Sequence, residues 1–172
     1  PKLKEFAYQQ VVEHRHIITI GLGESFLAQQ ILDIEEGLPH NIKLAYLPKV
    51  GLVRLRLTQI GNSEKGIDFY HEQLITRLGS HVVAVKDVTM EEAIVEAFTT
   101  DNIKLATAES CTGGSIASAI TAISGASAMF DCGVVSYHNR IKQEVLGVQA
   151  DTLAQFGAVS EQTVIEMAAG VR

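Results

Sequence analysis

The sequence predicts a mixed α/β (α+β) protein made of two units, and three observations support this. Strand-like and helix-like stretches alternate along both halves of the chain. The 172 residues are 47% hydrophobic and 20% charged, which suits a packed core rather than a disordered chain. No apolar run approaches the roughly 20 residues that a membrane span requires. We place the boundary between the units near residue 86.

The first unit, residues 1–86, is expected to follow the order βαββαβ. β-branched or alternating apolar residues predict its strands, and apolar residues at helical spacing predict its helices. On the strand at 52–58, Val53, Leu55 and Leu57 alternate with Arg54 and Arg56, so one face is buried and the other is wet. The strands are expected at 16–21, 42–47, 52–58 and 81–85, and the helices at 24–36 and from a Ser63 cap to residue 78.

The second unit, residues 87–172, is expected to be an incomplete α/β domain. Thr89 and Glu92 have the spacing of a capping box, so a helix follows them. Strands are expected at 103–106 and within 129–137, with a glycine-containing turn and a helix between them. Asn139 is expected to cap a helix that runs to residue 146, and Ser160 a last helix whose apolar face needs a partner.

Composition excludes several classes of function. The net charge of -6 gives no general attraction to nucleic acid or to anionic lipid, so neither partner is expected. Cys111 and Cys132 are too few for a disulfide framework, which makes a reducing cytoplasm the default and small core residues the expected role. His14 and His16 share a strand face without a third ligand nearby, so no metal site is expected.

The strongest local signal is the segment TAESCTGG at residues 107–114. Its position between a strand and a helix places hydroxyls and a thiol over free helical N–H groups, which favour an anion or a developing oxyanion. Gly113 and Gly114 allow the backbone to approach a ligand closely. An ordinary helix cap with a glycine turn explains the pattern equally well.

A second cluster, SYHNRIK at residues 136–142, follows the last expected strand. Lys142 falls in the first turn of a helix, where the helix dipole and partial burial favour the neutral amine. A neutral Lys can take a proton from a Ser hydroxyl. The commoner alternative is a solvated surface Lys. Between the two clusters, Ser127 in the loop SGASA is either a turn residue or a further hydroxyl for a site.

The second half resembles the C-terminal domain of the CinA competence/damage-inducible family, the nicotinamide mononucleotide deamidase. The resemblance rests on LATAESCTGG, the SGAS loop, GVVSYHNRIK, LGV and GAVSEQTVIEMAAGVR, in this order and spacing. The first half is similar to the KH-like middle portion of long CinA proteins, mainly through GLGES followed by LAQQI. This implies a KH-like or ferredoxin-like small domain before the deamidase domain.

The resemblance implies that the protein hydrolyses nicotinamide mononucleotide to nicotinate mononucleotide and ammonia, without a metal or cofactor. A Ser–Lys mechanism would use Ser110 or Ser127 as the nucleophile and Lys142 as the base. Tyr137 would orient or relay the proton. The expected substrate-binding residues are Glu109, Thr112, Gly113 and Gly114. Long family members also carry an N-terminal domain and continue past the position of Arg172, so we expect a truncated deamidase domain, and both an active and an inactive fragment stay open.

Two alternatives remain open at this point. A cysteine amidase would use Cys111 with Glu109 and Lys142. An inactive nucleotide-binding or assembly module would use the βαββαβ half for packing. The expected partners are a small nucleotide substrate and a second copy of the chain in a homodimer.

Overall fold

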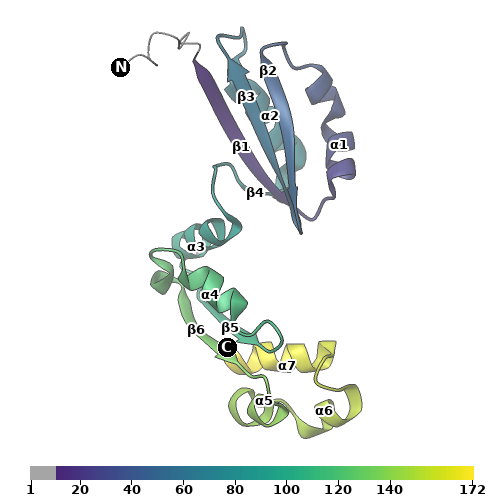
Figure 1. Cartoon of the computed structure of the whole chain (residues 1–172), viewed down its shortest axis with the longest axis vertical. Coiled ribbons are helices and arrows are strands. Elements are labelled where there is room, and N and C mark those ends of the chain that lie inside the picture. The colour runs from purple at the N-terminus through teal and green to yellow at the C-terminus, as the bar shows by residue number, and fades with distance from the viewer. Residues whose placement is uncertain (1–10) are drawn as a thin grey trace, which may run out of the picture. The chain divides into compact units, whose positions relative to one another are not determined.

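The computed structural model describes residues 11–172 and divides into two compact units, Pro1–Val88 and Thr89–Arg172 (Figure 1). Within residues 11–172, no helix has both the length and the apolar character needed to cross a bilayer. Each unit is described by itself.

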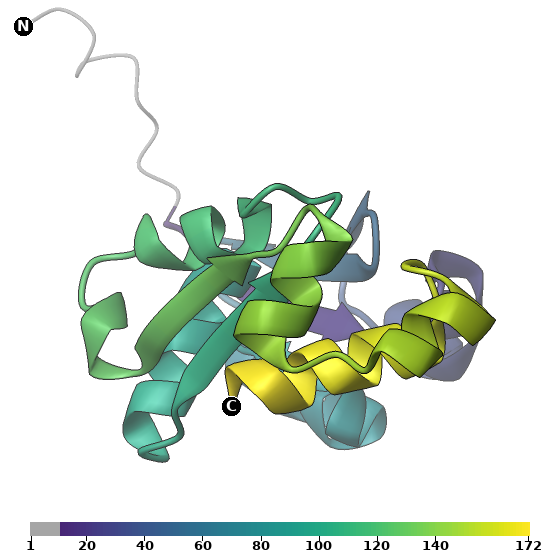
Figure 2. The same ribbon diagram turned by 90° about the horizontal axis from the view of Figure 1, so that it is seen from below.

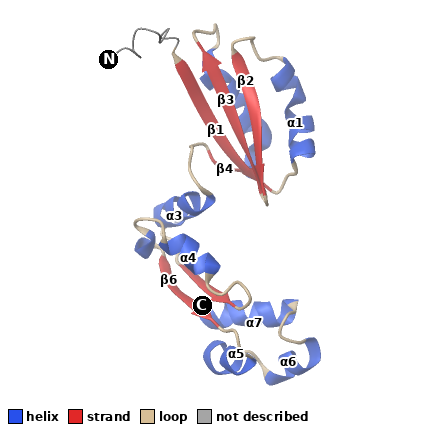
Figure 3. Ribbon diagram, in the orientation of Figure 1, coloured by secondary structure: helices blue, strands red, loops and turns tan. Residues whose placement is uncertain are grey.

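The first unit is a four-stranded antiparallel sheet with two helices, in the expected βαββαβ order (Figure 3). The strands lie in the order β2-β3-β1-β4, with β1 and β3 in the middle. A short 3₁₀ turn, Gly79–His81, precedes the last strand. The elements are β1 (Val12–Ile20), α1 (Glu24–Glu36), β2 (Ile42–Lys49), β3 (Leu52–Ile60), α2 (Gly66–Leu78) and β4 (Val82–Ala84).

One face of this sheet forms the core of the first unit with α1 and α2. Val53, Leu55 and Leu57 of β3 are at most 3% exposed, whereas the intervening Arg54 and Arg56 are only half-buried, as the alternation predicted. The buried apolar residues come from three strands and both helices, so this core is continuous: Ile17, Leu27, Ile31, Ile34, Ile42, Val53, Leu55, Leu57, Ile67, Leu74 and Leu78.

The second unit contains two parallel strands and five α-helices. The strands β5 (Leu105–Glu109) and β6 (Phe130–Val135) lie side by side (Figure 2), with α4 in contact with both strands and α7 in contact with β5. A 3₁₀ turn, Ala126–Ala128, precedes β6. The helices are α3 (Met90–Thr100), α4 (Ser115–Thr121), α5 (Asn139–Leu146), α6 (Ala150–Phe156) and α7 (Glu161–Val171). Because the strands are parallel, the segments that follow them meet at one edge.

The capping-box prediction is confirmed, and so is the cap at Ser160. The Thr89 hydroxyl accepts from the Glu92 N–H, and the Glu92 carboxylate accepts from the Thr89 N–H at 2.7 Å. The Ser160 hydroxyl accepts from the Thr163 N–H.

Other local predictions were wrong. Ser63 lies outside α2, whose N-cap is Lys65 with no side-chain hydrogen bond. His138 rather than Asn139 caps α5, through its Nδ1 and the Arg140 N–H. Helix α6 was not predicted. Cys111 and Cys132 are exposed, so neither is a core residue.

Candidate active site

The edge where β5 and β6 end brings Ser110 and Lys142 together, although 32 residues separate them in the sequence. Ser110 directly follows β5, and Lys142 lies in the first turn of α5, which follows β6. Lys142 Nζ lies 3.0 Å from Ser110 Oγ. The Lys142 side chain is only 1% exposed, so it is not a solvated surface lysine.

Two main-chain carbonyl groups complete the surroundings of the Lys142 nitrogen. Nζ donates a short hydrogen bond to the Ser136 carbonyl and lies 3.4 Å from the Tyr137 carbonyl. A neutral amine has two N–H bonds and one lone pair. As an ammonium, Nζ can donate to all three oxygens; as a neutral amine, it can donate to the two carbonyls and accept the Ser110 hydroxyl proton. The three contacts therefore fit a general base beside a nucleophile.

Glu109 holds the turn that carries Ser110. Its side chain is 3% exposed, and its carboxylate accepts from the main-chain N–H groups of Ala117 at 2.8 Å and Ile116 at 3.1 Å. Burial opposes ionisation, but these bonds and those from Thr112 and Gly114 outweigh it and lower the pKa of Glu109 below its usual 4.5. The carboxylate thus occupies the N-terminus of α4.

This placement differs from the substrate-binding role expected for Glu109. A carboxylate that fills the helix N-terminus leaves no room there for a substrate anion. The main-chain carbonyl of Glu109 accepts from the Ser136 N–H at 2.8 Å, and the Ser136 carbonyl in turn binds Lys142. Glu109 therefore connects the two sides of the Ser–Lys pair as a positioning residue.

The glycine turn supplies fewer free amides than expected. Gly113 donates to the Ser110 carbonyl, and Gly114 takes part in binding Glu109. Across residues 11–172, the amides of Cys111 and Thr112 have no protein acceptor. Thr112 therefore remains available as an oxyanion donor, together with Cys111, which the sequence did not single out for this role.

Ser127 lies away from the pair within this chain. It belongs to the turn that precedes β6, whereas Ser110 follows the end of β5. Since the strands are parallel, Ser127 lies near the end of the sheet where the strands start, and Ser110 lies at the end where they finish. Five residues of β5 at about 3.3 Å each separate these two ends by roughly 16 Å. Ser127 instead lines a separate hollow of about 390 Å³ with Ser124 and Phe130. The structure therefore brings only Ser110 to Lys142.

The other expected side chains lie around the rim of the site. The Tyr137 side chain is 76% exposed, and the contact of this residue with Lys142 is made by its carbonyl. Cys111 is exposed and adjoins Ser110 in the turn. Within the described residues, no group of three or more His, Cys, Asp or Glu side chains could hold a metal ion.

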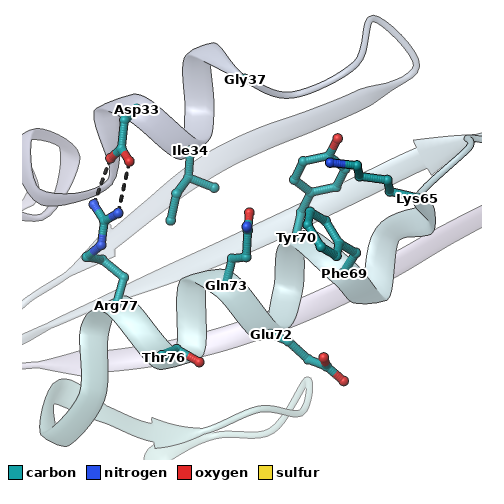
Figure 4. A pocket seen from close by; sticks show the side chains of 10 residues that line it. All are labelled: Asp33, Ile34, Gly37, Lys65, Phe69, Tyr70, Glu72, Gln73, Thr76 and Arg77. Carbon is teal, nitrogen blue, oxygen red and sulfur yellow. Dashed lines mark hydrogen bonds and ion pairs between the residues drawn. The ribbon is translucent and has the colours of Figure 1, made fainter.

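The first unit contains a larger hollow that lacks this chemistry. The hollow, about 790 Å³ between α1 and α2, is shown in Figure 4. Arg77 pairs with Asp33 at 2.7 Å at one end, and the Lys65 ammonium lies 4.7 Å from the centre of the Phe69 ring. None of the ten residues that line it forms a nucleophile–base pair, so the second unit carries the candidate active site.

The fold and the site define a two-unit α/β protein in which a buried lysine lies beside a half-buried serine, an arrangement that suits a base and its nucleophile. Two family models match the chain: "CinA C-terminal domain" over residues 87–172 and "Damage-inducible protein CinA KH domain" over residues 14–84. The chain therefore belongs to the CinA family.

Curated relatives match nearly the whole chain. A "CinA-like protein" of Chloroherpeton thalassium is 43% identical over 163 residues, which are 92% of this chain and 39% of that protein. Another "CinA-like protein", of Cytophaga hutchinsonii, is 41% identical and covers 99% of this chain and 42% of its own length. The chain thus spans about two fifths of these relatives.

Solved structures are similar to about half of the chain. A competence/damage-inducible protein from Agrobacterium tumefaciens has 49% identity and a TM-score of 0.46, over 47% of this chain and 49% of its own. A competence damage-inducible protein from Klebsiella pneumoniae has 42% identity and a TM-score of 0.47, over 47% and 50%.

Proposed function

We propose that this protein is a nicotinamide-nucleotide amidase, which hydrolyses the carboxamide of nicotinamide mononucleotide to nicotinate mononucleotide and ammonia. The observation that carries the proposal is the 3.0 Å contact between Nζ of the buried Lys142 and Oγ of the half-buried Ser110. Membership of the CinA family and its resemblance to the deamidase domain support the choice of substrate. The pair itself supports amide hydrolysis without a metal.

The reaction would proceed in two halves. Neutral Lys142 takes the Ser110 proton while Ser110 Oγ attacks the carboxamide carbon. The resulting ammonium then protonates the leaving nitrogen as the carbon–nitrogen bond breaks. Ammonia departs and leaves an acyl-enzyme ester on Ser110. Water, deprotonated by the same amine, attacks the ester. The ammonium so formed returns its proton to Ser110 Oγ as the acyl–oxygen bond breaks, and the carboxylic acid product releases its proton to solvent.

The remaining residues would assist from the turn and the rim. The free amides of Cys111 and Thr112 would stabilise the oxyanion, and the exposed Tyr137 side chain would reach the substrate from the mouth of the site. Removing one oxyanion donor from a hydrolase typically costs about 10²–10³ in kcat.

Ammonia release from nicotinamide mononucleotide tests the assignment, with Ser110→Ala and Ser127→Ala compared in this chain and in the complete protein. Ser110→Ala is expected to lose at least about 10³-fold in kcat, since nucleophile and base act together. Ser127→Ala is the matched control and should retain most of the turnover. Normal turnover in Ser110→Ala would rule out Ser110 as the nucleophile.

The cysteine alternative is tested in the same assay. Cys111→Ala is expected to leave kcat within about tenfold of the original, because Lys142 contacts Ser110 and not the Cys111 thiol. A loss as large as that of Ser110→Ala would favour the cysteine amidase. Binding of nicotinamide mononucleotide without ammonia release, in the complete protein, would favour the inactive module.

We also propose that the protein forms a homodimer. Exposed apolar side chains on α6 and α7 support this, because Phe156, Val164 and Ile165 are 49%, 59% and 58% exposed. Light scattering at several concentrations is expected to give twice the chain mass. A monomer at all concentrations would contradict the proposal.

A further inference from the structure

The face of the first unit's sheet that points away from α1 and α2 is rich in basic side chains. The register places His14 opposite Thr58, His16 opposite Arg56, and Ala45 on the other side of Arg56. Residues paired across strands share a face, so a row of basic groups crosses the centre of the sheet. It consists of His14, His16, Lys43, Arg54 and Arg56.

Two adjacent members of this row have buried nitrogen atoms without partners. Arg56 Nε and His16 Nδ1 are both shielded from solvent and form no hydrogen bond. Arg56 also makes no ion pair within the described part of the chain, whereas Arg54 binds the Asp87 carboxylate and the Val88 carbonyl. An arginine N–H can only donate, so its burial without an acceptor costs free energy and calls for an explanation.

The surroundings of His16 also favour a missing anion. Burial lowers the pKa of His16 below its usual 6.5; Asp87 opposes this, while Arg54 and Arg56 add to the lowering. The Asp87 carboxylate is 3.8 Å from His16 Nδ1, beyond hydrogen-bond distance. The Asp87 carboxylate therefore binds Arg54 more closely than His16, and within residues 11–172 neither His16 Nδ1 nor Arg56 Nε has a hydrogen-bond acceptor.

We propose that His16 and Arg56, flanked by Lys43, form a binding site for the phosphate group of a ligand on the face of the sheet opposite α1 and α2. A phosphate offers several strong acceptor oxygens and up to two negative charges, which match a guanidinium fork, an imidazole and an ammonium together. Ala45, which pairs with Arg56 across the strands, has a small side chain. The site lies in the first unit and is independent of the proposed amidase reaction.

NMR of the histidine rings in the 172-residue chain tests this proposal. Inorganic phosphate is titrated at constant pH and ionic strength, with potassium acetate as the carboxylate control. The ring signals of His16, assigned with His16→Gln, are expected to shift saturably with phosphate. Arg56→Gln should weaken the apparent affinity at least tenfold, and Arg56→Lys should restore part of it. The matched control Arg77→Gln, on the helical side of the unit, should change nothing.

Equal shifts with acetate, or an unchanged phosphate affinity in both Arg56 variants, would overturn the proposal. If Arg56→Gln does not fold, Arg56→Lys decides alone, because it keeps the charge and loses the planar fork. Parallel titrations with adenosine 5′-monophosphate and with a short single-stranded oligonucleotide distinguish a small phosphate ester from a polymer backbone. Binding of either supports the site, and binding of neither contradicts it.

Discussion

Replacing Gly170 by Ala tests the contact between α5 and α7 that holds Lys142 in place. A methyl group added at Gly170 would lie 1.9 Å from the Leu146 carbonyl oxygen and 2.6 Å from its carbon. These are backbone atoms of α5, so the helices must separate. Ala favours a helix over Gly by about 1 kcal/mol, and less near a helix end. Overpacking costs about 1–3 kcal/mol and occasionally more, so the clash is expected to prevail.

We therefore expect Gly170→Ala to lower the free energy of unfolding of the second unit by roughly 2 kcal/mol in urea denaturation. Leu146 lies one turn after Lys142 on α5, so activity should fall as well. Ala169→Gly is the matched control for helix propensity, because residue 169 is exposed on the same helix. If Gly170→Ala is instead more stable than the original, by the difference in helix propensity between Ala and Gly, the described packing of α5 on α7 is refuted.

Three further predictions concern the site. Lys142→Met, which keeps an unbranched side chain and removes the amine, is expected to lower kcat for ammonia release by about 10²–10⁴-fold, while Lys104→Met on the surface should not. Since the pKa of Glu109 is lower in the folded state, its contribution to stability is present above about pH 4.5 and is lost as pH falls through the folded pKa. The free energy of unfolding should therefore fall less steeply with decreasing pH in Glu109→Gln than in the original protein. An identical pH dependence in the two proteins would contradict this. Gly114→Ala should destabilise the unit by about 1–2 kcal/mol, because φ is +93° and the new methyl group would lie 3.1 Å from Val135; unchanged urea stability would show that the turn tolerates a side chain.

The order of elements was predictable from the sequence where local signals are strong. Alternation on β3, the Thr89 capping box and the Ser160 cap all depend on residues close in sequence, and the structure confirms them. Helix α6 is different. The Glu166 carboxylate from α7 accepts from the Gln149 N–H at 2.8 Å and from the Thr152 hydroxyl, so a distant residue stabilises the start of this helix. No local pattern contains that information.

The site was predictable only in part, because its geometry also depends on contacts between residues that are distant in the sequence. The motifs pointed to Ser110 and Lys142, but their distance depends on two strands pairing in parallel, which sequence spacing does not state. The choice between Ser110 and Ser127 also required the register of β5 and β6. The hydrogen bonds of Glu109 were not predicted, because a carboxylate beside a glycine turn suggests a ligand contact. The buried bonds to Ile116 and Ala117 are seven and eight residues away.

The proposal that Ser110 forms the covalent intermediate is tested most directly by mass spectrometry of the acid-quenched reaction with nicotinamide mononucleotide. The account predicts an ester adduct with the mass of the acyl nucleotide on the peptide that contains Ser110, and its absence in Lys142→Met. An adduct that maps to Ser127 or to the Cys111 thiol would contradict it.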